Sequence, residues 1–308
     1  MGDAAVISDL VWLCRDDGLL RYRAKWATSQ SAKVPTREEF WKQLVLALLS
    51  SQQIWTPGSL IDRFSQTEPF ALALASYRGM DEQQVIARLK GFRFARRVAA
   101  YLQADHEALF GTPNEWTKIE SQLRELAAQV NSPADPAHRN REREVARYLA
   151  AMLRGVGPKQ SRNILQELEL VRYEIPIDSR VAEWLRTNLG WEIRTDQLGD
   201  GNIYEKWLDK IQIACAKAEV LPTIFDAAAY DWERIGRQMQ KTTAIGYVNR
   251  NGQVVIRNTG LPGTDHGQSV YQLACSNCGH TYGANGSDIH LRLCPGCQGG
   301  AKGLDYRQ

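Results

Sequence analysis

Apolar side chains recur at intervals of three and four through much of the first 235 residues, which is the period of an amphipathic helix. Turn-forming residues lie near these stretches, as in Pro57-Gly58 and Asn131-Ser132-Pro133. The clearest stretches are residues 40–52, 83–103, 116–130, 141–153 and 204–218. The pattern therefore predicts a mainly helical first domain.

The pattern changes near residue 236. Residues 244–258 alternate between apolar and polar positions around Asn251-Gly252, a dipeptide that favours a two-residue hairpin turn. From residue 236 onward the chain also holds 13 of its 24 glycines. We therefore expect a mainly α fold class, with a helical domain over residues 1–236 and a small β-rich domain over residues 237–308.

Composition places the chain among ordinary soluble globular proteins, with 308 residues of which 44% are hydrophobic and 24% charged. Its longest apolar runs, such as residues 44–50, are far shorter than the roughly 18–20 residues that span a bilayer. The first residues lack a basic flank before an apolar stretch, so we expect no signal peptide and a cytoplasmic protein. The net charge of +3 does not by itself indicate a nucleic-acid partner.

Four of the six cysteines form the pattern C-x2-C-x15-C-x2-C: Cys275, Cys278, Cys294 and Cys297. In a cytoplasmic chain this spacing predicts a metal site rather than disulfides. Two such pairs can present four sulfurs to one tetrahedral ion, and the residues between them suit a small β-ribbon. We expect a zinc ribbon with structural Zn²⁺, and iron is the alternative ion that the same ligands accept.

The role of this ribbon has two interpretations. It either caps the core only, or it also contacts DNA through Arg250, Arg257 and Arg292. His280 and His290 lie close to the cysteines in sequence, and we expect them at the surface or beside the ligands rather than among them.

Residues 153–165 read LRGVGPKQSRNIL and lie between two helical stretches. Gly155 and Gly157 flank Val156, so the backbone can turn tightly and expose N–H groups at the start of the second helix. Such a turn suits a DNA phosphate and resembles the helix-hairpin-helix element of DNA-binding proteins. We expect DNA contacts from Gly155, Val156, Gly157, Lys159 and Ser161. Lys159 itself is a phosphate contact, a surface lysine or a nucleophile, and the turn alone does not decide between these roles.

An acidic residue follows the turn and the helical stretch after it. This residue, Asp178, ends the segment YEIPID and begins the next helical stretch. The proline-containing segment Ile175-Pro176-Ile177 would hold this carboxylate in place. Asp178 is then a catalytic carboxylate, a helix N-cap, or both.

Together, the GVGPK turn, the short helix after it and the IPID segment resemble the helix-hairpin-helix (HhH-GPD) DNA glycosylase superfamily, which includes endonuclease III and the 8-oxoguanine DNA glycosylases. LLSSQQ (48–53) resembles that superfamily's LLS-x-Q helix end, and residues 221–236 resemble the closing helix of the 8-oxoguanine glycosylases. The chain departs from the pattern in its cysteine spacing, which differs from the iron–sulfur loop of endonuclease III. It also has Ser179-Arg180 where that branch has Thr-His, and Pro158 before the lysine is seen in non-catalytic hairpins as well.

The resemblance implies a DNA glycosylase that flips a base out of double-stranded DNA and cleaves its N-glycosidic bond, leaving an abasic site. In this role Asp178 stabilises the positive charge that develops on the sugar, and Gln52 fills the gap in the duplex. In bifunctional members a lysine at the position of Lys159 forms a Schiff base and permits strand cleavage by β-elimination. We expect a monomer that is associated with the nucleoid when it is bound to DNA.

Two kinds of base are candidates for excision. The 8-oxoguanine-like features favour an oxidised purine, and a bulky modified cytosine of phage DNA, removed in anti-phage defence, is the alternative. Two other classes of protein also remain: a non-catalytic DNA-binding protein that uses the hairpin and ribbon, and a zinc-ribbon adaptor between proteins. A pure binder has no use for the charge of Asp178 beside a phosphate, and an adaptor does not need the hairpin glycines.

Overall fold

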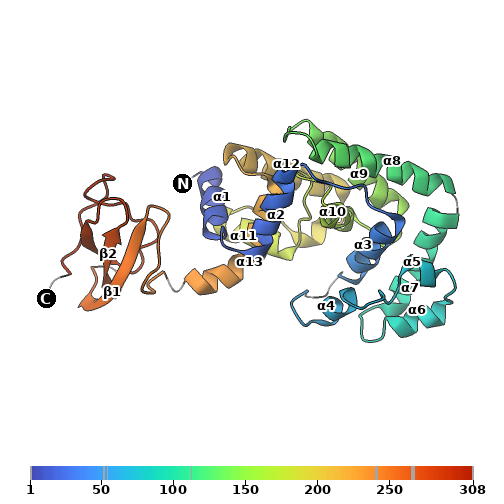
Figure 1. The fold of residues 1–308 in the computed structure, drawn as a ribbon, viewed down its shortest axis with the longest axis horizontal. Coiled ribbons are helices and arrows are strands. Elements are labelled where there is room, and N and C mark those ends of the chain that lie inside the picture. Colours follow the sequence, from blue (N-terminus) through green and yellow to red (C-terminus); the bar gives the residue numbers. More distant parts are fainter. Residues whose placement is uncertain are drawn as a thin grey trace. The chain divides into compact units, whose positions relative to one another are not determined.

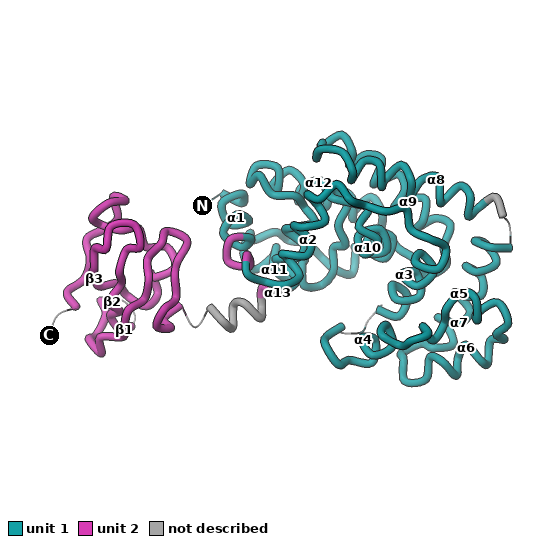
Figure 2. The backbone as a smooth tube through the Cα atoms, viewed as in Figure 1, with its two compact units in different colours: residues 1–11, 16–230 teal, residues 12–15, 231–308 magenta. Residues whose placement is uncertain are grey.

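The chain divides into two compact units in the computed structural model, which describes residues 2–50, 53, 55–111, 113–239, 242–264 and 268–306. One unit comprises residues 1–11 and 16–230, and the other comprises residues 12–15 and 231–308 (Figure 2). Helix α13 (Pro222–Met239) runs through residue 236, so a domain boundary at that residue stays a prediction.

Helices make up the ordered elements of the larger unit, as Figure 1 shows. The first are α1 (Asp3–Leu13), α2 (Gly18–Ser29), α3 (Arg37–Leu49), α4 (Leu60–Ser65), α5 (Leu74–Tyr77), α6 (Glu82–Arg88) and α7 (Ala95–His106). A π-helical turn, η1 (Glu107–Gly111), follows α7. Then come α8 (Pro113–Val130), α9 (His138–Met152), α10 (Pro158–Glu167), α11 (Ser179–Leu189), the 3₁₀ turn η2 (Thr195–Gln197), α12 (Gly201–Lys217) and α13.

Helix α3 lies at the centre of the main core. Thr36 begins it with a capping box, in which the Thr36 side chain and the Glu39 side chain each bind the other residue's backbone N–H. Phe40, Trp41 and every residue of 44–49 are buried, so the helix is apolar on nearly all sides. It packs against α4, α5, α7 and α10, which places it directly behind the hairpin that precedes α10.

The stretch 83–103 does not form one continuous helix. It divides into α6 and α7, because Gly91 has φ of +91° and Phe94 has φ of +59°, and both values are incompatible with a right-handed helix. The apolar period continues across the break because Val85 of α6 and Val98 of α7 are both buried in the same core.

The smaller unit contains a three-stranded antiparallel sheet in the order β1-β2-β3, made of β1 (Gln253–Pro262), β2 (Ser269–Cys275) and β3 (Thr281–Asn285). A hairpin turn forms at the predicted place, but its loop comprises residues 250–252, because the N–H of Asn249 donates to the carbonyl of Gln253, and Gly252 has φ of +72°. Before this loop the first arm is reduced to one bridge between Val248 and Val254. A small core under the sheet contains Val255, Leu273, Tyr282, Ala284 and Ile289. The fold class predicted from the sequence, a mainly helical domain followed by a small β-rich one, is confirmed.

Within the part of the chain that the structure describes, every helix is too short or too polar to cross a membrane.

Candidate active site and metal centre

The hairpin connects α9 to α10 through residues 153–157. Gly155 has φ of +74°, a conformation that side chains other than glycine rarely adopt. A Cβ atom at this position would also lie only 2.4 Å from Cδ2 of Tyr101, which belongs to α7. Val156 is 4% exposed and anchors the turn in the core. The turn therefore needs glycine at residue 155 for two independent reasons.

Helix α10 begins directly after this turn. Pro158 occupies the first helical position, where its missing N–H costs nothing. The N–H of Gly157 donates to Oε1 of Gln160 over 3.3 Å. Ser161 is fully buried, and its hydroxyl donates to the carbonyl of Pro158 over 3.2 Å. The side chain of Ser161 is thus buried within the first turn of α10, so we do not place it among the DNA contacts proposed below.

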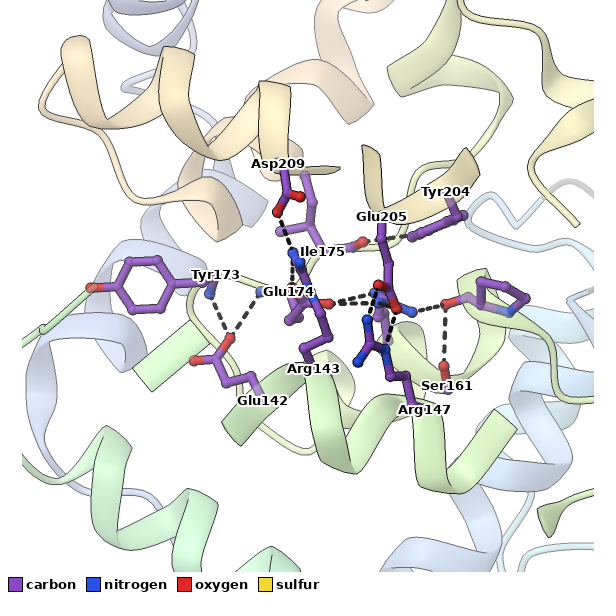
Figure 3. Close-up of polar contacts among 12 residues, drawn as sticks. Glu142, Arg143, Arg147, Ser161, Tyr173, Glu174, Ile175, Tyr204, Glu205 and Asp209 are labelled. Atoms are coloured by element: carbon purple, nitrogen blue, oxygen red, sulfur yellow. Dashed lines mark hydrogen bonds and ion pairs between the residues drawn. The ribbon is translucent and has the colours of Figure 1, made fainter. Parts of the chain in front are cut away.

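The segment 172–177, which we call the strap, leads from α10 to Asp178 and is held by buried polar groups (Figure 3). The first of these is Glu142 of α9, which is 2% exposed. Its carboxylate accepts the backbone N–H groups of Arg172, Tyr173 and Glu174 at 2.9, 2.8 and 2.9 Å. One side chain thereby fixes three consecutive residues of the strap.

A second buried carboxylate ties the strap to the helices around it. Glu174 is fully buried and accepts Nε of Arg143 at 2.9 Å and Nε of Arg162 at 2.8 Å. Nη1 of Arg162 also donates to the carbonyl of Pro158 over 3.0 Å. Arg162 therefore joins the start of α10 to the strap, so that the hairpin and the segment before Asp178 are parts of one rigid assembly.

The hydroxyl of Tyr204, on α12, fixes the end of the strap. It accepts the N–H of Ile177 at 2.6 Å. It also donates to the carbonyl of Ile175 at 3.0 Å (Figure 3). Asp178 comes next and caps α11, because its Oδ1 accepts the N–H groups of Arg180 and Val181 at 2.9 and 3.0 Å. Both cap bonds use Oδ1, so the cap does not use Oδ2.

Lys159 and Asp178 line the same cleft, which has a volume of about 490 Å³. Its lining also includes Gly157, Pro158, Gln160, Ile177, Ser179, Thr195, Leu198 and Gly199. Lys159 is half-buried, and burial lowers the pKa of its ammonium group, an effect that the charge of Asp178 opposes and that of Arg180 reinforces. A lowered pKa increases the neutral, nucleophilic fraction of an amine at neutral pH. The structure thus brings a candidate nucleophile and a candidate carboxylate together at the N-terminus of α10.

A third ionisable group is buried near this pair. Asp226 of α13 is 9% exposed and accepts Nε2 of Gln166 at 2.9 Å. Burial raises the pKa of Asp226 to about 7, the charge of Arg23 lowers it, and the charge of Asp178 raises it further. The sequence contains no local signal for this group.

The larger unit has the fold of a DNA glycosylase. The chain is similar to the 8-oxoguanine DNA glycosylase of Methanocaldococcus jannaschii with a TM-score of 0.53 and 14% identity, over 74% of this chain and 94% of that one. It is also similar to the structure of the 8-oxoguanine glycosylase/lyase from that organism in complex with a 15mer DNA containing 8-oxoguanine, with a TM-score of 0.51 and 14% identity, over 75% of this chain and 97% of that one. No protein-family model and no curated protein matches the chain.

These similarities confirm the helix-hairpin-helix glycosylase fold that the sequence motifs implied. Gln52, the expected wedge, lies outside the described residues. Glu142 and Tyr204 belong to the site but were not predicted from the sequence. Glu142 had a usable signal, because it belongs to the buried stripe of α9 with Val145, Ala146 and Leu149.

The four cysteines of the ribbon lie together, with their Sγ atoms within 4.8 Å of one another. Sγ of Cys275 is 3.6 Å from that of Cys297, and Sγ of Cys278 is 3.6 Å from that of Cys294. A disulfide has an S–S distance of about 2.0 Å, whereas tetrahedral zinc with bonds of about 2.3 Å separates its sulfurs by about 3.8 Å. The cluster therefore fits a four-coordinate ion and not a pair of disulfides.

Polar groups support the cluster from outside. Nε2 of Gln253, a fully buried side chain on β1, lies 3.7 Å from Sγ of Cys275. The N–H of Gly296 donates to Sγ of Cys294 over 3.3 Å. N–H donors of this kind stabilise thiolates, which are the form of cysteine that binds metal.

Proposed function

We propose that this protein is a DNA glycosylase that excises a damaged or modified base from double-stranded DNA. The observation that carries the proposal is that Lys159, Asp178 and the N-terminus of α10 line one cleft. A helix N-terminus favours a phosphate, and the two side chains supply an amine and a carboxylate beside it. The similarity in fold to a glycosylase that has been solved with DNA supports the same conclusion.

The chemistry follows from these groups. The hairpin binds the backbone next to the target nucleotide, and the base leaves the stack, because its glycosidic bond is inaccessible inside the duplex. Neutral Lys159 attacks C1′, the bond between C1′ and the base breaks, and the base leaves with the electron pair and takes up a proton. Asp178 stabilises the positive charge on the sugar while this bond breaks.

The covalent adduct accounts for strand cleavage. The sugar ring opens to give a Schiff base between Lys159 and C1′, which acidifies the proton on C2′. Loss of that proton and of the 3′ phosphate is β-elimination, and hydrolysis of the Schiff base then releases Lys159. We therefore propose a bifunctional glycosylase/lyase rather than an enzyme that stops at the abasic site.

We propose an oxidised purine such as 8-oxoguanine as the target, because the solved proteins of similar fold are 8-oxoguanine glycosylases. We further propose that the ribbon holds a structural Zn²⁺ through Cys275, Cys278, Cys294 and Cys297. The sulfur geometry supports this assignment.

The test is an excision assay on duplex oligonucleotides that carry 8-oxoguanine opposite each of the four bases, with a panel of other modified bases alongside. Asp178→Asn is the decisive variant, because asparagine is an equally good N-cap and removes only the charge. We expect its excision rate to fall at least about 100-fold, as when one electrostatic group of a catalytic site is removed.

The matched control is Asp17→Asn. Asp17 caps α2 in the same way, with Oδ1 accepting the N–H groups of Leu19 and Leu20 at 2.8 and 3.2 Å. This control should keep the wild-type rate. Excision by Asp178→Asn at the wild-type rate would refute the proposal.

A further inference from the structure

A buried carboxylate on α7 holds the backbone of the hairpin from behind. Asp105 is fully buried, and its Oδ1 accepts the N–H of Arg154 at 2.6 Å. Arg154 immediately precedes Gly155, whose backbone is left-handed, so this bond fixes the chain directly before the turn. Among the described residues, Oδ2 of Asp105 is buried and has no hydrogen-bond partner.

A second residue of α7 contacts the same turn. Tyr101 lies four positions before Asp105, and residues four apart lie on one face of a helix. The ring of Tyr101 occupies the space where a side chain on residue 155 would be. One face of α7 therefore supplies an apolar surface for Gly155 and a hydrogen-bond acceptor for Arg154.

Residue 105 lies on the buried face of α7, where an apolar side chain would be expected. The neighbouring buried residues of α7 are Val98, Ala99 and Leu102. Burial raises the pKa of Asp105 to about 7, while its bond to Arg154 and the charge of Arg154 lower it. A buried acid with one unpaired oxygen costs stability, and the bond to the turn is the compensating contact that the structure provides.

We propose that Asp105 is a positioning residue for DNA binding, which fixes the hairpin turn so that the N–H groups at the start of α10 face a DNA phosphate. The inference rests on the proposed function, because it takes the hairpin to bind DNA and its test also measures excision. Without the acceptor on Asp105, the N–H of Arg154 loses its partner in this turn, and the turn populates conformations that pair it differently. The apparent affinity for DNA is then the intrinsic affinity multiplied by the fraction of molecules that keep the binding conformation.

The experiment compares Asp105→Leu, which removes the acceptor and keeps the branching of the side chain, with Asp105→Asn, which keeps the acceptor. Fluorescence anisotropy gives the Kd for an undamaged duplex, and single-turnover excision gives the rate at saturating DNA. We expect the Kd of Asp105→Leu to rise roughly tenfold with the saturated rate within about twofold of wild type. We expect Asp105→Asn to keep the wild-type values in both measurements.

Three outcomes would overturn the inference: wild-type affinity in Asp105→Leu, an equal loss in both variants, or a fall in the saturated rate without a change in Kd. If Asp105→Leu does not fold, hydrogen exchange in the full chain decides instead. The amide of Arg154 should then be protected in wild type and in Asp105→Asn, and rapid exchange in wild type overturns the inference. Failure of wild type to bind duplex DNA at all would instead refute the proposed function.

Discussion

The hydroxyl of Tyr204 is the most direct link between the folded core and Asp178. Replacing this residue by phenylalanine removes one oxygen and keeps the ring, which stacks with the guanidinium of Arg162 at 4.7 Å. The change leaves the N–H of Ile177 and the carbonyl of Ile175 without the partner that bonds them at 2.6 and 3.0 Å.

The magnitude follows from burial. Tyr204 is fully buried, so water cannot replace the lost hydroxyl. A buried backbone group that loses its partner costs about 1–3 kcal/mol, and two such groups give a loss of roughly 2–6 kcal/mol in the free energy of unfolding. With a denaturant slope of about 2–3 kcal/mol per M, the midpoint of urea unfolding should fall by roughly 1–2 M.

The assay is urea unfolding followed by circular dichroism, with single-turnover excision measured on the same samples. Tyr22→Phe is the matched control, because the hydroxyl of Tyr22 also has a partner, Glu169, but its side chain is 51% exposed. That control should lose no more than about 0.5 kcal/mol.

We also expect Tyr204→Phe to slow excision at saturating DNA, because Asp178 directly follows Ile177 in the chain, while leaving the Kd for undamaged duplex near wild type. Equal unfolding midpoints for Tyr204→Phe and wild type would refute this account of how Asp178 is held. An equal loss in both tyrosine variants would refute it as well.

Three further predictions concern other parts of the molecule. Gly155→Ala should lower the affinity for duplex DNA, measured by anisotropy, and the stability, measured by urea unfolding, by more than Gly190→Ala. Both glycines have positive φ, but of the two only residue 155 meets a neighbouring ring, so equal effects of the two substitutions would contradict this account. Purified protein should contain one zinc per chain by atomic emission, and Cys297→Ser or prolonged chelation should release it and unfold the ribbon; a zinc-free protein with a folded ribbon would contradict the metal assignment. Asp226, with its pKa raised to about 7 from 3.8, binds a proton more tightly in the folded state, so its contribution to stability is complete below about pH 4 and is lost as the pH rises through 7. Between pH 4 and 7, Asp226 should therefore make the free energy of unfolding fall by up to about 1.4 kcal/mol per pH unit as the pH rises, and Asp226→Asn should remove this contribution. An unchanged slope in Asp226→Asn would count against a protonated Asp226.

The local features of the site could be predicted from the sequence because they depend on residues close together in the chain. The GVGPK turn needs glycine at residue 155 whatever surrounds it, and Asp178 caps the helix that begins at the next residue. The cysteine spacing likewise predicted the sulfur cluster, because one ion requires all four ligands within a few ångströms.

The supporting groups could not be predicted in the same way, because their partners are distant in sequence. Glu142 binds residues about thirty positions ahead, and Asp105 binds a residue 49 positions ahead. No local pattern shows that a buried carboxylate will meet three free N–H groups. The apolar period also gives no sign of the break between α6 and α7, because it is the same on both sides of Gly91 and both helices bury their apolar faces in one core.

The central claim is that Lys159 acts as a nucleophile on DNA, and one measurement tests it without knowledge of the target base. The protein is mixed with a duplex that contains an abasic site, borohydride is added, and the covalent complexes are quantified on a denaturing gel. Lys159→Ala is tested beside Lys25→Ala, which removes an exposed lysine of α2. The account predicts a covalent complex with wild type and Lys25→Ala, and none with Lys159→Ala. Trapping that is absent from wild type, or that persists in Lys159→Ala, would contradict it.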